Sequence, residues 1–549
     1  MAIIPYILQG AFALSQLPGS FTFSRLQQKY KDTQEQLLLK NLKRNQDSHF
    51  GREHGFKEIH DITSYRKRVP IRNYRAFLPY IENIRQGQQQ ILTAENVLLC
   101  HLTGGTTGTK LIPYTRSLKQ EFQHALAPWL FDVFQHFPHI MQGKTYWTIT
   151  PPGQKTHSEK DQLETGFEED SSYFGWKGYF LQHLFAVPSW VAQTQDIEQF
   201  RLLTLYFLLR AKNLRWISIW SPTFLLVLLE ELEQHVETLL ASLHGGFPTF
   251  SIPDQFANFW KKRPAPQRTR ELESVLSLPQ QERYKQIWPH LSFISLWKDA
   301  YAHHPAQRLK TLFPDVYFQG KGLLATEGVM TIPLYEIAQE GFSSSIPAFT
   351  SHFLEFVSEN ESEVRCLWEL EEGKIYSILL TTGGGLYRYD IGDVVRVEGF
   401  YHKLPVLRFL GRKGRFSDLV GEKLEETFVT EALKQTFATH PIAYSFLLLA
   451  PESWEQSQGY IVFLESSEPH IVLLKMAEAL ETALRRNFHY AFAVKMGQLS
   501  PVKIFLVDKY GQRDYVRRCL EAGQKLGDIK PLIFDTRTGW QHIFQGDIL

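Results

Sequence analysis

Cysteine is almost absent from this sequence, with three residues in 549, at Cys100, Cys366 and Cys519. They are too far apart in the chain for a zinc-binding motif, and they do not form the dense framework of a disulfide-stabilised secreted domain. A chain with so few cysteines fits a reducing compartment. We therefore predict a cytoplasmic location.

The sequence also lacks an excess of positive or negative charge and any apolar run long enough to span a membrane. Lys and Arg number 59 against 58 Asp and Glu, so no broad field exists to attract nucleic acid or an anionic membrane. The most apolar segment, 224–232, contains two glutamates, and the apolar first 14 residues lack the basic start of a signal peptide. We expect small-molecule partners, no nucleic acid and no membrane span.

A composition that is 43% hydrophobic over 549 residues predicts two or more packed domains. Segments with the apolar pattern of strands alternate with helical patterns, which indicates βαβ units and an α/β body. The expected strands are 144–150, 215–220, 291–297 and 315–320, and the expected helices are 23–42, 200–209, 223–243 and 268–276.

The pattern changes after residue 364. Short strands separated by turn residues over 364–410 favour an antiparallel or barrel-like part of the first domain. The basic segment GRKGR, 411–415, then leads to a tail with the pattern of a separate α+β domain. We predict domains at 1–411 and 412–549, with the small second domain mobile about this junction.

The segment LTGGTTGTKLIPYT, 102–115, is rich in glycine and threonine. It fails the Walker A pattern because Lys110 follows Thr109 instead of glycine, and because a proline and a strand pattern follow where a helix should begin. Glycines and hydroxyls between two strands suit either an ordinary hairpin turn or a loop that closes on phosphates.

The run from Thr103 to Pro113 resembles the phosphate-loop signature of the adenylate-forming enzymes, the superfamily of acyl-CoA synthetases and luciferases. Gly104 stands where that superfamily usually has serine, which removes one hydroxyl donor and weakens the expected hold on phosphate. The resemblance implies contacts to ATP from Thr103, Gly104, Gly105, Thr106, Thr107, Gly108 and Lys110.

A second segment, KGLLATEGV at 321–329, resembles the Thr/Ser-Glu motif of the same superfamily. The resemblance implies that Thr326 and Glu327 contact the nucleotide and that Glu327 is the ligand of Mg²⁺, which prefers one or two carboxylates plus phosphate oxygens. An exposed glutamate in a turn is the alternative. Leu323 and Leu324 stand where many relatives have an aromatic residue stacked on adenine.

The segment LYRYDIGDVVRV, 386–397, resembles the signature of the acyl-acid amido synthetases, the auxin-responsive family, with this chain as a bacterial-type member. The resemblance implies that Asp393 accepts hydrogen bonds from the ribose hydroxyls of ATP. Residues 383–385, three glycines, are expected to form the turn ahead of this strand.

Two later segments resemble the mobile part of the superfamily. Over 408–426, Arg412 matches a ribose-phosphate contact, Lys413 and Gly414 match the pivot, and Lys423 matches a lysine that approaches the phosphates. Over 522–534, Lys530 matches the catalytic lysine of adenylation, and Lys525 is its rival.

Together these motifs imply an α/β adenylate-forming ligase that uses ATP and Mg²⁺. The expected reaction is adenylation of a carboxylic acid followed by transfer of the acyl group to an amine, such as an amino acid. Lys530, Lys423 and Glu327 are the expected catalytic residues. An acyl-CoA or acyl-carrier synthetase, and a nucleotide-binding relative without turnover, stay open as alternatives.

Overall fold

The computed structural model describes residues 3–105, 108–147, 165–166, 184–194, 196–252, 263–299, 302–342, 344–358, 363–413, 416–420, 422, 424–454, 457–495, 497–522, 524, 529–530 and 532–549. The chain forms two compact units. Unit 1 is Met1–Lys298, Pro305–Ile391 and Val395–Phe409, and unit 2 is Asp299–His304, Gly392–Val394 and Leu410–Leu549. Sheets and helices alternate in the chain, so the predicted mixed α/β class is confirmed.

A four-stranded parallel sheet lies in unit 1, in the order β3-β5-β6-β7. Its strands are β3 (Lys144–Trp147), β5 (Leu214–Ser218), β6 (Phe293–Leu296) and β7 (Tyr317–Gly320). All four overlap the strands expected from sequence. Their apolar runs reflect burial on both faces, because crossover helices such as α8 (Ile197–Arg210) and α9 (Pro222–Gln234) cover a parallel sheet.

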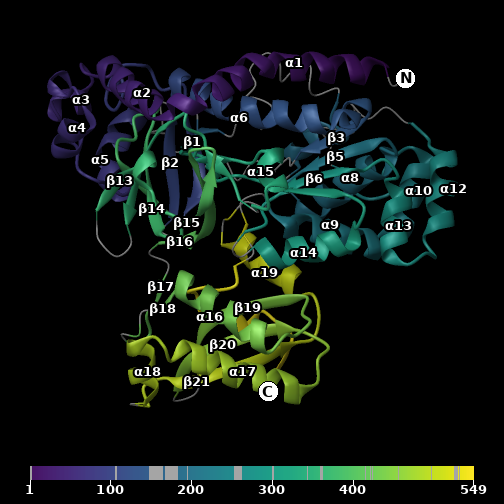
Figure 1. Ribbon diagram of the computed structural model, residues 1–549. Helices are drawn as coiled ribbons and strands as arrows, with labels where there is room; N and C mark the ends of the chain where they lie inside the picture. Colours follow the sequence, from purple (N-terminus) through teal and green to yellow (C-terminus); the bar gives the residue numbers. More distant parts are fainter. Residues whose placement is uncertain are drawn as a thin grey trace. The chain divides into compact units, whose positions relative to one another are not determined.

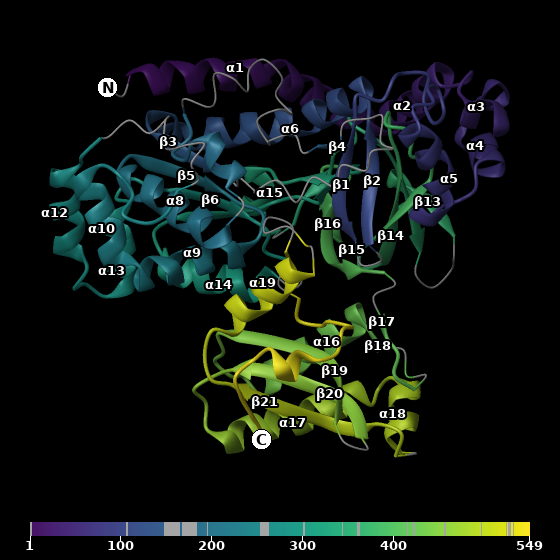
Figure 2. The same cartoon turned by 180° about the vertical axis from the view of Figure 1, so that it is seen from behind.

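Two long helices run beside one another along this sheet (Figures 1 and 2). Helix α6 (Arg116–His136) contacts β5 through Trp129 and Phe134, whose ring centroids lie 6.4 and 6.0 Å from that of Trp216. Helix α1 (Ile3–Leu26) packs on α6, with Phe12 6.0 Å from Phe134. The aromatic stripe of α6 is therefore core.

Two of the expected helices are each interrupted in the structure, so the predicted lengths of these helices were wrong. The segment 223–243 forms α9 and α10 (Val236–Gly245), with the break at His235, whose φ of −116° leaves the helical region. The segment 23–42 is divided by a 3₁₀ turn, Gln27–Lys29. Neither break contains glycine or proline, which explains why the residue pattern did not indicate it.

The Gly-Thr segment forms an antiparallel hairpin in which β1 (Leu99–Gly105) pairs with β2 (Gly108–Tyr114) up to Gly105 and Gly108. A five-stranded sheet has the order β13-β12-β14-β15-β16. Its strands are β12 (Phe353–Ser358), β13 (Val364–Cys366), β14 (Ile375–Thr381), β15 (Tyr389–Tyr401) and β16 (Leu404–Arg412). Strand β12, antiparallel to both neighbours, was not expected from sequence.

The other described elements lie around these sheets. The helices are α2 (Tyr30–Arg44), α3 (His49–Glu53), α4 (Ile62–Arg68), α5 (Tyr74–Arg85), α12 (Pro266–Val275), α13 (Gln280–Ile287), α14 (His303–Leu312) and α15 (Tyr335–Gln339). The short strands are β4 (Thr165–Gly166), β8 (Leu324–Ala325), β9 (Gly328–Val329), β10 (Thr331–Ile332) and β11 (Ile346–Pro347).

Unit 2 is built on a four-stranded sheet of its own, in the order β19-β20-β21-β22 (Figure 2). Along β20, Tyr460, Val462 and Leu464 belong to a core with α16 and α17, whereas Phe463 contacts Phe544 at a ring distance of 5.3 Å. This period-2 alternation shows that both faces are covered. The elements are α16 (Glu426–Thr439), α17 (His470–Leu484), α18 (Phe488–Lys495), α19 (Gly511–Glu521), β17 (Phe416–Ser417), β18 (Leu424–Glu425), β19 (Phe446–Trp454), β20 (Ser457–Glu465), β21 (Ser500–Val507) and β22 (Gly546–Ile548).

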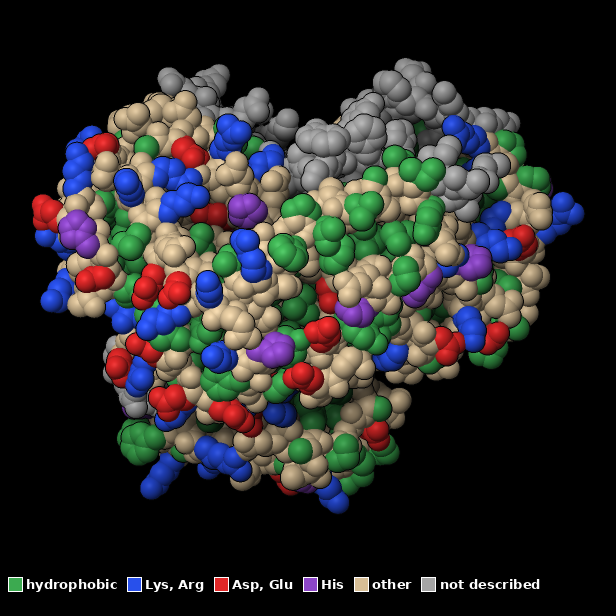
Figure 3. All heavy atoms as spheres, turned by 45° about the horizontal axis from the view of Figure 1, so that its top comes forward, with side chains coloured by type: hydrophobic (Ala, Val, Ile, Leu, Met, Phe, Trp, Pro, Cys, Tyr) green, Lys and Arg blue, Asp and Glu red, His purple; other side chains and the backbone are tan. Residues whose placement is uncertain are grey.

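On the face shown in Figure 3, charged side chains of both signs are interspersed, in keeping with the near-zero net charge. Among the helices of the described ranges, none combines the length and the apolar character that crossing a bilayer requires.

The aromatic core around Trp216 yields a stability prediction. Trp216→Ala removes a fully buried side chain that contacts α6, β3 and β6, so we expect the free energy of unfolding to fall by about 3–5 kcal/mol. Leu14→Ala, at a side chain 66% exposed, is the control and should change it by about 0.5 kcal/mol or less. Urea denaturation of both variants measures the difference, and equal midpoints would contradict this account of the core.

Candidate active site

Glu327 is a buried carboxylate at the tip of a tight turn. Ala325 pairs with Gly328 in the β8–β9 hairpin, which leaves Thr326 and Glu327 as the two turn residues. The residue is 3% exposed. Its Oε2 accepts a hydrogen bond from the Thr326 hydroxyl at 3.0 Å, and its Oε1 accepts one from the Tyr389 hydroxyl at 3.2 Å. The sequence alternative of an exposed turn glutamate is therefore wrong.

Lys110 lies beside this carboxylate. It follows the hairpin tip on β2, and its Nζ lies 3.7 Å from Glu327 Oε1. The same ammonium donates to the Tyr389 hydroxyl at 3.1 Å and lies over the rings of Tyr74 and Tyr389, at 5.4 and 5.8 Å from their centroids. Lysine, phenol and carboxylate therefore form one contact group, drawn from three segments more than 60 residues apart.

The backbone at Arg388 sets the position of Tyr389. Arg388 has φ +47°, in the left-handed region that costs a non-glycine residue about 1–3 kcal/mol. Its buried guanidinium is held by Glu355 Oε2 at 3.0 Å and by the Val69 carbonyl at 2.9 Å. These charge-assisted bonds offset the backbone strain and direct the next residue, Tyr389, toward Glu327.

Two further tyrosines, Tyr74 and Tyr114, bond the backbone next to Lys110 and at Thr326. The Tyr74 hydroxyl accepts from the Leu111 amide at 2.6 Å and donates to its carbonyl at 3.2 Å, next to Lys110 on β2. Burial raises the pKa of Tyr74, so it stays a neutral phenol beside the ammonium. The Tyr114 hydroxyl donates to the Thr326 carbonyl at 2.9 Å and ties β2 to the turn that carries Glu327.

Asp393 and Arg412 form a second pair, which belongs to unit 2. Arg412 Nε donates to Asp393 Oδ1 at 2.8 Å. The adjoining Gly392 has φ +80°, which a side chain would disfavour, and its carbonyl accepts from the Lys413 amide. The two residues matched to ribose contacts thus lie together on β15 and β16.

The remaining residues matched by resemblance are placed only in part. Thr103, Gly104, Gly105 and Gly108 pair along the β1–β2 hairpin. Lys530 belongs to unit 2, where its carbonyl accepts from the Tyr515 hydroxyl at 3.0 Å. Thr106, Thr107, Gly414, Lys423 and Lys525 lie outside the described residues.

The sequence interpretation missed the phenols. Tyr389 lies inside the quoted Tyr-Arg-Tyr segment, and Tyr114 inside LIPYT, but neither was singled out as a site residue. A tyrosine in a strand pattern is typical of core packing, so only the three-dimensional contact to Lys110 and Glu327 distinguishes Tyr389.

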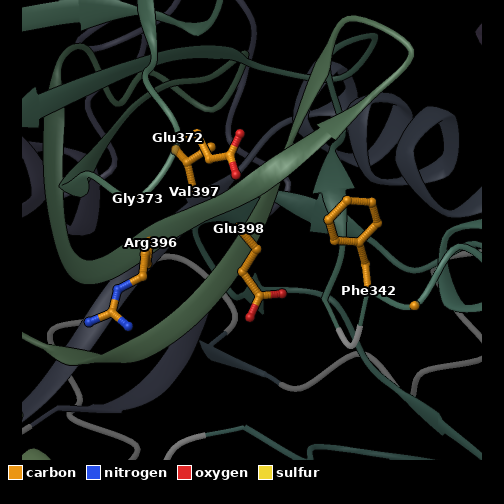
Figure 4. Close-up of a pocket in the computed structure, with 7 residues that line it drawn as sticks. Phe342, Glu372, Gly373, Arg396, Val397 and Glu398 are labelled. Atoms are coloured by element: carbon orange, nitrogen blue, oxygen red, sulfur yellow. The ribbon is translucent and has the colours of Figure 1, made fainter.

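A shallow hollow of about 360 Å³ lies elsewhere in unit 1. Figure 4 shows Arg396, Glu398 and Phe342 spread along its wall without converging on one point. Glu398 is engaged by Ser344 at 2.6 Å and Arg408 at 3.2 Å. This hollow contains none of the residues matched to nucleotide contacts, and we assign it no ligand.

The chemistry of the Lys110–Tyr389–Glu327 group suits a polyphosphate. An ammonium offers up to three donors to phosphate oxygens, and a single carboxylate is the protein contribution that Mg²⁺ takes when phosphates and water complete its shell. No cluster of three or more His, Cys, Asp or Glu side chains that could hold a metal alone occurs within the ranges resolved above. The donor set therefore fits a metal ion that arrives with its phosphates.

The fold that carries this site is that of the adenylate-forming enzymes. 2-Hydroxyisobutyryl-CoA ligase in the postadenylation state, in complex with 2-HIB-AMP, superposes with a TM-score of 0.52 at 10% identity, over 86% of this chain and 85% of that one. The structure of AtGH3.15 acyl acid amido synthetase in complex with 2,4-DB superposes with a TM-score of 0.84 at 18% identity, over 98% and 97%.

Comparison of the sequence with models of known protein families identifies its family. The GH3 family N-terminal domain matches residues 21–318, and the GH3 family central domain matches residues 345–412. The chain belongs to the GH3 family. Indole-3-acetic acid-amido synthetase GH3.17 of Arabidopsis thaliana is 24% identical over 457 residues, covering 74% of this chain and 73% of that protein. The resemblance drawn from the motifs is confirmed.

The phenol of Tyr389 yields a prediction. Tyr389→Phe removes the hydroxyl that joins Lys110 to Glu327, a bond to charged groups, so acid-dependent pyrophosphate release should fall about 10- to 100-fold. Tyr401→Phe is the matched control, because Tyr401 lies on the same strand and its hydroxyl also bonds a carboxylate, Glu336, outside the site. Equal rates in the two variants would remove Tyr389 from the site.

Proposed function

We propose that this chain is an acyl-acid amido synthetase, which couples ATP to the conversion of a carboxylic acid and an amine into an amide, with release of AMP and pyrophosphate. Membership of the GH3 family supports the reaction class. The relatives named indole-3-acetic acid-amido synthetases and the neighbour bound to 2,4-DB support an organic acid as the acyl substrate and an amide as the product. We propose an amino acid as the amine.

In the first half-reaction, a carboxylate oxygen of the acid attacks the α-phosphorus of ATP. The bond from that phosphorus to the bridging β-oxygen breaks, and pyrophosphate leaves. Lys110 and the hairpin 103–108 bind the phosphates, Asp393 and Arg412 hold the ribose, and Lys530 stabilises the charge that develops on the α-phosphate. Lys423 approaches the phosphates in one arrangement of the small domain, residues 412–549.

Glu327 would hold Mg²⁺ through its carboxylate, with Thr326 beside it. A bound Mg²⁺ supplies charge neutralisation to the phosphate oxygens, which makes pyrophosphate a better leaving group. Glu327 and Lys110 would together orient the phosphates, and this shared role is supported by the 3.7 Å between Glu327 Oε1 and Lys110 Nζ.

In the second half-reaction, the amine nitrogen attacks the carbonyl carbon of the acyl-adenylate. The bond from that carbon to the AMP oxygen breaks, the nitrogen loses a proton, and the amide forms. We propose that the small domain turns about Arg412, Lys413 and Gly414 between the two half-reactions, so that the amine gains access. We propose a cytoplasmic location, which is supported by the low cysteine content of the sequence, three in 549 residues.

The acceptor distinguishes this proposal from an acyl-CoA synthetase. A panel of aromatic, aliphatic and hydroxy acids is screened for pyrophosphate release, with hydroxylamine to trap the acyl-adenylate. For each active acid, AMP release is then compared with amino acids and with coenzyme A. Stimulation by amino acids is expected. Stimulation by coenzyme A alone would favour the synthetase alternative, and ATP binding without pyrophosphate release from any acid would favour a relative without turnover.

The two carboxylates yield a prediction on the first half-reaction. Glu327→Ala and Asp393→Ala should each abolish most pyrophosphate release, because each removes a side chain proposed to contact the nucleotide. Glu398→Ala is the control, since this carboxylate lies on β15 but bonds Ser344 and Arg408. Undiminished release in both site variants, with the control also active, would exclude the proposed nucleotide site.

The terminal lysines yield a second prediction. Lys530→Ala should slow adenylation about 10²- to 10³-fold, the effect of removing one preorganised charge from the transition state. Lys525→Ala should slow adenylation by less than about threefold, because the proposal assigns Lys525 no contact with the charge that develops on the α-phosphate. Single-turnover formation of the hydroxamate measures both, and the reverse ranking would assign the role to Lys525.

A further inference from the structure

A buried histidine contacts the strand that follows Glu327. His352, 1% exposed, lies just before β12, with Nε2 3.0 Å from the Val329 amide nitrogen and Nδ1 2.9 Å from Glu121 Oε2. The Val329 N–H can only donate, so Nε2 accepts and the ring proton resides on Nδ1, where it donates to Glu121. Both ring nitrogens are thereby assigned from the identity of their partners.

The histidine fixes the Glu327 turn from its C-terminal side. Val329 pairs with Leu324 in the β8–β9 hairpin, whose turn contains Glu327. The ring approaches so closely that a Cβ on Gly328 would lie 2.8 Å from Nε2. Glycine at this position therefore lets the imidazole reach the backbone two residues after the carboxylate that contacts Lys110.

The other end of the pair reaches the segment that carries Tyr389. Glu121 lies on α6, and both of its carboxylate oxygens accept from the Gly383 amide at 2.9 Å. Residues 382–385 form the expected turn ahead of β15, with Gly385 at φ +94°. Glu121 thus joins the imidazole to the turn that leads into Tyr389, and Tyr389 itself bonds Glu327.

These hydrogen bonds, together with the two short backbone segments between them, form a closed circuit that contains Glu327. From Glu327 it passes through Tyr389 and its strand to Gly383, then through Glu121 to His352, and returns through Val329 to Glu327. A buried hydrogen-bonded chain of this kind restricts each member more than separate bonds would. The turn holding Glu327 consists of two residues between strands of two residues each, so its own ladder contributes little restraint.

We propose that His352, oriented by its bond to Glu121, is a positioning residue for Glu327, which holds the Glu327 carboxylate at the place where it would meet the phosphate-bound Mg²⁺ of ATP. This inference rests on the proposed function. The imidazole acts through the Val329 amide and touches no substrate. Its neutral form with the proton on Nδ1 is the working form, because a second proton on Nε2 would face the Val329 N–H.

Two substitutions at His352 separate the two contacts. His352→Gln has a terminal amide oxygen that reaches the place of Nε2 and accepts from Val329. His352→Asn has an amide nitrogen in the place of Nδ1, which still donates to Glu121, but it offers no acceptor to Val329. His352→Asn therefore loses the link to the Glu327 turn, whereas His352→Gln keeps it. Both variants lose the imidazole ring, so the loss of side-chain volume is similar.

The measurement is the Mg²⁺ concentration that gives half-maximal pyrophosphate release at saturating ATP, together with kcat. We expect His352→Asn to raise that concentration about tenfold and lower kcat about 10- to 100-fold, and His352→Gln to stay within about threefold of the parent protein. A merely structural histidine would lower Tm in both variants and leave the Mg²⁺ dependence unchanged. That result, or a parent-like His352→Asn, would overturn the proposal.

Two additions keep the test decisive. If His352→Asn does not fold, Gly328→Ala displaces the ring from the Val329 side and should show the same rise in Mg²⁺ requirement. If no acid supports pyrophosphate release by the parent protein, the proposed function fails, and calorimetric ATP titrations with and without Mg²⁺ still compare the variants. A Mg²⁺-dependent gain in ATP affinity that is lost only in His352→Asn would support the positioning role, and its retention in both would refute it.

Discussion

The contact of Lys110 with Glu327 through Tyr389 is the constraint on which the site depends. Glu327 is almost fully buried, and a buried carboxylate without hydrogen bonds or a counter-ion costs several kcal/mol. Its partners come from β2 and β15, so the carboxylate keeps its environment only while the hairpin, the five-stranded sheet and its own turn stay in register. The chemistry thus requires that three distant segments fold together.

Helix α6 links the site to the apolar core. Its N-cap, Thr115, accepts from the Leu118 amide and donates to the Gly383 carbonyl, while Glu121, two turns further on, accepts from the Gly383 amide. Its later turns pack on Trp216 of the parallel sheet through aromatic rings. One rigid element therefore connects the glycine turn ahead of β15 to the core of unit 1, and the position of Tyr389 follows from packing as well as from polar bonds.

Local pattern accounts for what the sequence predicted and for what it missed. The four parallel strands are apolar runs, the hairpin follows from glycines between strand patterns, and Glu327 follows from a motif of adjacent residues. By contrast, Glu121 and His352 are 231 residues apart, so no window of sequence contains their pairing. The break at His235 has no glycine or proline, and β12 is recognisable only through its partners β13 and β14. The family was predictable because its motifs are local, whereas the residues that position them are not.

The same contacts explain how a strongly charged substrate enters a partly buried site. The Lys110 side chain is 15% exposed, so an unpaired ammonium there would be poorly solvated before ATP binds. Glu327 neutralises it in the structure. In the proposed reaction Lys110 would exchange this partner for a phosphate oxygen, and Glu327 would be left to neutralise a cation bound with the phosphates. Each charge keeps an opposite partner throughout, so the site does not need to desolvate an isolated ion, and the phenol of Tyr389 remains a neutral bridge between them.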